Sequence, residues 1–77
     1  MSINIRYFAS LREKMGKAED SIDAGLARTV ADVWGVVAND TGMPSNTLCS
    51  INMEYVGPEH AVKDGDEVAF FPPVTGG

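Results

Sequence analysis

The last two residues of the chain could perform the clearest chemistry that the sequence offers. Gly76 and Gly77 have no side chains and tolerate backbone angles closed to other residues. We expect such a pair to enter a channel only as wide as a polypeptide backbone and to present a bare α-carboxylate at its end. A carboxylate is a poor electrophile, but ATP can convert it to an acyl-adenylate. The activated glycyl carbonyl would then accept a sulfur, a thiol or an amine.

The glycines end a tail, residues 72–77, whose other residues also suit this chemistry. Pro72 and Pro73 favour an extended polyproline conformation, which makes the base of the tail semi-rigid. At ~3.3 Å per residue the tail reaches roughly 20 Å, and a partner could recognise Val74 and Thr75. The alternative is a flexible end without function. The combination of aromatic, proline and β-branched pairs in "FFPPVT" favours the functional interpretation.

Composition restricts what kind of protein positions this tail. The chain has 77 residues and 44% apolar residues, which predicts a single domain over residues 1–77. A domain of this size has little room for an enclosed active site. We therefore expect a binding or carrier module rather than a self-sufficient enzyme.

The acidic net charge of the chain argues against two classes of binding partner. The net charge is −5, with no run of Lys or Arg, so nucleic acid and anionic membranes are poor partners. A protein partner with a basic groove fits this net charge better.

The single cysteine, Cys49, excludes an internal disulfide and a Cys-rich metal site. The N-terminus is unlike a signal peptide and no apolar run has membrane-spanning length, which predicts a cytoplasmic protein.

Hydrophobic periodicity predicts the elements of the domain. Residues 3–8 alternate in the manner of a half-buried strand, and residues 67–71 form an apolar strand that we expect to be internal. Between them, the stretch 30–38 has one apolar stripe at helical spacing. This helix begins with a capping-box pattern at Thr29 and Asp32.

Weaker signals complete the pattern. "SLREKMG" predicts a short helix with Ser10 as its N-cap and Gly16 as its end. "AEDSID" predicts a strand, and "LCSINMEYV" predicts either one strand or two short ones. The order predicts an α+β fold, with a mixed sheet packed on one main helix.

Three aromatic residues are candidates for a partner interface. Phe8 and Phe71 lie on the polar phases of their strands, where an aromatic residue marks either a bulge or edge effect or an exposed contact. We favour contact, because Phe71 adjoins the tail and buried aromatic residues dominate interface energies. Tyr55 would join this patch.

Other reactive side chains have simpler interpretations. Cys49 is predicted to be a small buried hydrophobic residue, and His60 a surface residue without a second metal ligand at suitable spacing. Asp64, Asp66 and Glu67 lack the spacing of a calcium loop. We interpret them as a turn and a solvated acidic face.

Two segments carry a resemblance to a known family. "KDGDEVAFFPPVTGG", residues 63–77, and "YFASLREKMG", residues 7–16, resemble MoaD-type proteins, the small sulfur-carrier subunits of molybdopterin synthase. The resemblance implies a ubiquitin-like β-grasp fold. It also implies that an E1-like, MoeB-type adenylyltransferase adenylates Gly77 with ATP, after which a sulfur-donor protein supplies a thiocarboxylate. No bound cofactor is implied.

The resemblance further implies a partner and a reaction. The tail would insert into a MoaE-type large subunit, in a heterotetramer, and donate sulfur to cyclic pyranopterin monophosphate. The chain would be non-catalytic alone. Three alternatives stay open: a sulfur carrier for thiamine synthesis or tRNA thiolation, a modifier conjugated to lysines through Gly77, and an interaction domain with an inert tail.

Overall fold

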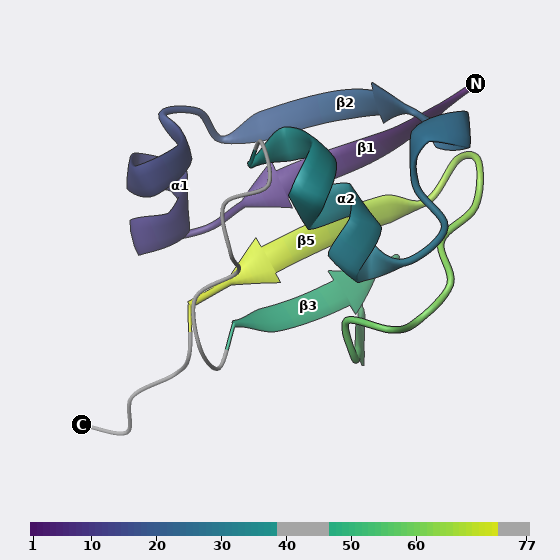
Figure 1. Cartoon of the computed structure of the whole chain (residues 1–77). Coiled ribbons are helices and arrows are strands. Elements are labelled where there is room, and N and C mark those ends of the chain that lie inside the picture. Colours follow the sequence, from purple (N-terminus) through teal and green to yellow (C-terminus); the bar gives the residue numbers. More distant parts are fainter. Residues whose placement is uncertain (39–46, 73–77) are drawn as a thin grey trace.

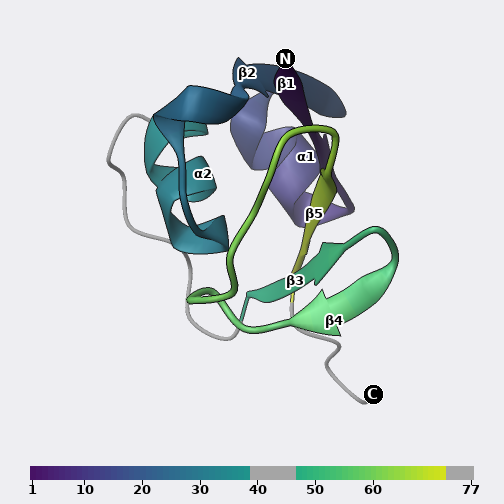
Figure 2. The ribbon, with the colours of Figure 1, turned by 90° about the vertical axis from the view of Figure 1, so that its right-hand side faces the viewer.

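The computed structural model describes residues 1–38 and 47–72, which form one mixed sheet and the helices around it. Figures 1 and 2 show helix α2 lying across one face of the sheet. The strands are β1 (Ser2–Tyr7), β2 (Glu19–Asp23), β3 (Leu48–Ile51), β4 (Glu54–Val56) and β5 (Glu67–Phe71). The helical elements are α1 (Ser10–Met15), the 3-10 turn η1 (Ala24–Leu26) and α2 (Val30–Val37). This arrangement confirms the predicted α+β class, and the segment from 48 to 56 forms two strands.

Strand order places β5 at the centre of the sheet, as the apolar sequence of its residues predicts. The order is β2-β1-β5-β3-β4, with β1 and β5 parallel and the other neighbours antiparallel. In the parallel register Tyr7 lies beside Phe70. The residues that follow this pair, Phe8 and Phe71, therefore lie side by side at this end of the two strands.

The core lies between the sheet and α2. Ile3, Ile5 and Tyr7 of β1 are buried, as are Val68 and Phe70 of β5, so the predicted phase of both strands is confirmed. The apolar stripe of α2 covers them through Val30, Val33 and Trp34. The Trp34 ring meets Phe70 edge to face, with ring centroids 5.0 Å apart. Full burial of each such side chain contributes roughly 1.5–3 kcal/mol.

The start of α2 has the predicted capping box. The hydroxyl of Thr29 accepts a hydrogen bond from the Asp32 N–H at 3.2 Å, and the Asp32 carboxylate accepts the N–H groups of Arg28 and Thr29 at 3.0 and 3.2 Å. These two backbone hydrogen bonds lower the pKa of Asp32, and the bond from Arg28 has the larger effect. The box satisfies donors that have no partner within the helix.

Replacing Thr29 with alanine should therefore destabilise the domain. We expect Thr29→Ala to lower the free energy of unfolding by about 1 kcal/mol, because the N-cap acceptor is lost. Urea unfolding measures this, and Thr29→Ser, which keeps a hydroxyl, is the matched control. Equal losses in both variants would show that the methyl group, and not the cap, is responsible.

The start of α1 differs from the prediction. Ser10 is the first helical residue and not the N-cap; the cap position is Ala9, whose φ is 52°, and no side chain caps the helix. The reason is tertiary, because the Phe8 N–H still bonds to the Phe70 carbonyl at 3.2 Å. This bond extends the β1–β5 pairing to Phe8. Ala9 is therefore the one residue between the paired strand and the first helical residue, Ser10. Gly16 ends the helix in the left-handed conformation, as predicted.

Candidate protein-docking site

The three aromatic residues predicted to contact a partner come together on the face of the sheet opposite α2. Alternation along a strand sends neighbouring side chains to opposite faces, so Phe71 points away from the core that holds Phe70. The rings of Phe8 and Phe71 stack, with centroids 4.7 Å apart and planes 7° apart. The Tyr55 ring lies 5.9 Å from Phe71. Chain segments far apart in sequence thus build one aromatic patch.

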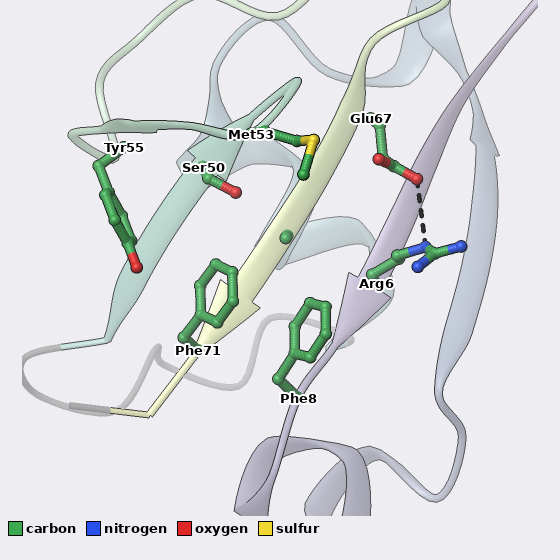
Figure 3. Close-up of a pocket in the computed structure, with 8 residues that line it drawn as sticks. Arg6, Phe8, Ser50, Met53, Tyr55, Glu67 and Phe71 are labelled. Atoms are coloured by element: carbon green, nitrogen blue, oxygen red, sulfur yellow. Dashed lines mark ion pairs between the residues drawn. The ribbon is translucent and has the colours of Figure 1, made fainter. Parts of the chain in front are cut away.

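The patch borders a pocket of about 280 Å³. Ser50 and Ala69, which are paired across β3 and β5, are buried small residues at its floor. The lining residues are Arg6, Phe8, Ser50, Met53, Tyr55, Glu67, Ala69 and Phe71, shown in Figure 3. Pockets for small molecules usually measure about 300–1,000 Å³. This pocket lies just below that range and suits one or two side chains of a protein partner.

The exposure of the lining residues supports the same interpretation. Phe8 is 38% exposed, Tyr55 72% and Met53 90%. Large apolar side chains gathered around one hollow are typical of protein–protein contact sites. The predicted patch is therefore available to a partner, although its role as an interface stays a prediction.

One side of the pocket is polar. Arg6 and Glu67 lie on neighbouring strands, with Arg6 Nε 3.1 Å from a Glu67 carboxylate oxygen, and both side chains are about half exposed. An exposed ion pair of this kind contributes at most about 1 kcal/mol to stability. An apolar centre beside a charged rim is the usual composition of an interface.

The prediction of a solvated acidic face is wrong for Asp66. It is 4% exposed, and its carboxylate accepts the Lys63 N–H at 2.9 Å and the Asn52 side-chain amide at 3.1 Å. The Asn52 amide oxygen in turn accepts the Glu67 N–H at 3.0 Å. Asp66 is therefore not solvated; it connects the β3–β4 hairpin to the start of β5.

The other reactive side chains are not part of the pocket. Cys49 is buried, as predicted, and burial, together with the nearby Glu59, raises the pKa of its thiol. A raised pKa leaves little thiolate at neutral pH. His60 is exposed, with Nδ1 2.9 Å from the Ala61 carbonyl oxygen. Across residues 1–38 and 47–72 there is no cluster of three potential metal ligands.

The tail begins beside the pocket. Pro72 is half-buried and follows Phe71 directly. The other predicted tail residues, Pro73, Val74, Thr75, Gly76 and Gly77, lie outside the described residues. A protein that binds the base of the tail at Pro72 would therefore lie next to the pocket.

Sequence reasoning overlooked Arg6, Met53 and Glu67 as lining residues. Arg6 carries a usable signal, because it lies on the outward phase of β1, two residues before Phe8. Met53 lies at the tip of the β3–β4 hairpin, and its place at the pocket depends on the pairing of β3 with β5. That pairing cannot be read from local periodicity.

A mixed sheet packed against one main helix, with the last strand β5 at its centre, defines a ubiquitin-like β-grasp domain. The ThiS family matches residues 5–77, and the chain belongs to this family. The molybdopterin synthase sulfur carrier subunit of Escherichia coli is 34% identical over 97% of this chain and 99% of its own length. That of Chlamydomonas reinhardtii is 36% identical over the whole of both chains. The predicted resemblance is confirmed.

Solved structures share the fold. Small archaeal modifier protein 1 from Haloferax volcanii superposes with a TM-score of 0.82 at 26% identity, over the whole of both chains. A complex of subunits 1 and 2 of the molybdopterin-converting factor from Helicobacter pylori contains a chain with a TM-score of 0.65. At 20% identity over both whole chains, this second likeness is one of fold. Within the described residues, no helix is long and apolar enough to cross a membrane.

Proposed function

We propose that this chain is the sulfur carrier subunit of a molybdopterin synthase and that it carries sulfur as a thiocarboxylate on Gly77. The observation that carries the proposal is the similarity of 34–36% over essentially whole chains to proteins of that name. The two C-terminal glycines and the pocket beside the tail suit this role.

The chemistry of loading takes place at Gly77. A carboxylate oxygen attacks the α-phosphorus of ATP in a MoeB-type adenylyltransferase, which releases pyrophosphate and forms a glycyl-adenylate. A sulfur atom at the oxidation level of sulfide, supplied by a donor protein, then attacks the glycyl carbonyl and displaces AMP, which leaves the thiocarboxylate without any oxidant or reductant. Glycine suits both steps because no side chain crowds the carbonyl. ATP is consumed in the partner, and no cofactor needs to stay bound to this chain.

Sulfur delivery takes place in a MoaE-type large subunit. The aromatic patch and pocket dock on that subunit, and the tail extends roughly 20 Å into its active site. There the thiocarboxylate sulfur displaces an oxygen substituent from a carbon of cyclic pyranopterin monophosphate, and water hydrolyses the resulting thioester. Hydrolysis leaves the sulfur on the pterin and returns the Gly77 carboxylate, and two such transfers complete the dithiolene. We expect the large subunit to supply the acid–base groups and the assembly to be a cytoplasmic heterotetramer.

A second candidate function is conjugation to other proteins. It is favoured by the close fold match to small archaeal modifier protein 1, at a TM-score of 0.82. Activation would give the same glycyl-adenylate, so adenylation alone does not separate the two functions. The two functions differ in the nucleophile that attacks the glycyl-adenylate. Sulfur would give a thiocarboxylate, whereas a lysine amine would leave Gly77 in an isopeptide bond.

Mass spectrometry of the protein from its native host distinguishes these outcomes. We expect an intact mass raised by the difference between one sulfur and one oxygen atom. The added sulfur should disappear, and molybdopterin should form, on incubation with the large subunit and cyclic pyranopterin monophosphate. Protein from a strain without the adenylyltransferase is the control and should lack the extra mass. Abundant branched peptides at Gly77, without thiocarboxylate under sulfur-replete conditions, would instead establish the modifier function.

A further inference from the structure

The tip of the β3–β4 hairpin has an unusual backbone conformation. Asn52 and Met53 connect the closing pair Ile51 and Glu54, and their φ angles are 50° and 74°. Two-residue hairpin connections with positive φ at both positions prefer Asn followed by Gly. Asn52 fits this preference. Met53 does not, because a side chain at such an angle brings Cβ close to the following carbonyl oxygen.

The surrounding structure prevents the turn from relaxing. The Asn52 N–H donates to the Glu67 carbonyl at 2.8 Å, and the Asn52 side chain bonds to both Asp66 and the Glu67 N–H. Asp66 is itself buried and held by the Lys63 N–H. This network ties the hairpin tip to the start of β5, so Met53 is held in the left-handed conformation beside the pocket.

Packing against the rest of the domain does little to offset the backbone strain at Met53. The Met53 side chain is 90% exposed and is not among the core residues. It does line the pocket. Figure 3 shows it at the opposite end from Phe8 and Phe71, with the Tyr55 ring on one side and the Arg6–Glu67 pair on the other. A glycine would satisfy the turn, but it would leave that end of the pocket open.

We propose that Met53 is a specificity-determining contact for the large subunit, packing against a bulky apolar side chain that this partner inserts between Met53 and the aromatic patch. The inference rests on the proposed function. The occupant follows from the tail, since Phe71 both lines the pocket and leads into Pro72. The pocket therefore lies at the base of the tail, on the surface that faces a protein bound around Pro72. A thioether is flexible and makes favourable contacts with aromatic rings, which suits this position.

The proposal predicts opposite effects of one substitution on stability and binding. Met53→Gly should raise the melting temperature by about 2–6 °C, because relief of the left-handed strain exceeds the gain in unfolded-chain entropy. The same variant should bind the large subunit about tenfold more weakly. Met53→Ala removes the contact but keeps the strain. It should lose affinity to a similar degree without the rise in melting temperature.

Thermal melts and calorimetric titration with purified large subunit test this, with Leu26→Ala as the matched control. Leu26 is another exposed apolar residue, 59% exposed, and lies outside the pocket, so its truncation should leave affinity unchanged. A Met53→Gly variant that binds as tightly as the wild type, or that melts at a lower temperature, would overturn the assignment of Met53. Failure of the wild type itself to bind the large subunit would instead reject the proposed function, and this inference with it.

Discussion

Removing Gly77, or adding one residue after it, should abolish sulfur transfer while leaving thermal unfolding unchanged. The proposed chemistry requires a glycine carboxylate at the end of the tail. An extra residue moves that group out of position and places a side chain where only backbone fits. The fold should be unaffected because the last strand ends at Phe71 and the described core residues precede it.

The assay is molybdopterin formation from loaded carrier, large subunit and cyclic pyranopterin monophosphate, alongside a melting curve for each variant. A matched control adds one residue before Met1, which is exposed, and should keep full activity. A C-terminally extended variant that transfers sulfur normally would show that the Gly77 carboxylate is not the reactive group.

Truncating Phe70 and Phe71 should affect different properties, although the two residues are neighbours in sequence. Phe70 is fully buried and packs against Trp34, so Phe70→Ala should lower the free energy of unfolding by about 3–5 kcal/mol. For a domain whose total stability is about 5–15 kcal/mol, this is a large fraction. Phe71 is half-buried on the opposite face, and its loss should destabilise the fold less.

Phe71→Ala should instead weaken association with the large subunit by about 1–3 kcal/mol, the range of interface aromatic residues. Denaturant melts of both variants and calorimetric titration of the Phe71 variant measure the two effects, with the folded wild type as reference. The opposite pattern, in which Phe71→Ala unfolds the domain and Phe70→Ala does not, would contradict the strand phase.

Local sequence pattern was sufficient to predict which face of each central strand is buried. In β1 and β5, alternation alone separates Ile5 and Phe70 from Arg6 and Phe71, because a strand repeats every two residues. The capping box of Thr29 and Asp32 is equally local, since its partners are three residues apart. The family was also recognisable from sequence, because its motif is a continuous segment at the end of the chain.

Contacts between residues far apart in the sequence were decided only by the tertiary structure. Asp66 looked like a solvated turn residue, yet its carboxylate binds Asn52, which lies 14 positions away. The N-cap of α1 shifted to Ala9 because Phe8 pairs with the distant Phe70. Periodicity carries no information about such partners.

The sequence by itself determined the fold class, the core phase of the strands and the membership of a sulfur-carrier family. The tertiary structure decided which outward-facing residues meet. The parallel register of β1 and β5 stacks Phe8 on Phe71, and the pairing of β3 with β5 brings Met53 and Tyr55 to the same pocket. Burial phase depends on neighbours along one strand, whereas a docking surface depends on the register between strands, which is set by the packing of the whole sheet.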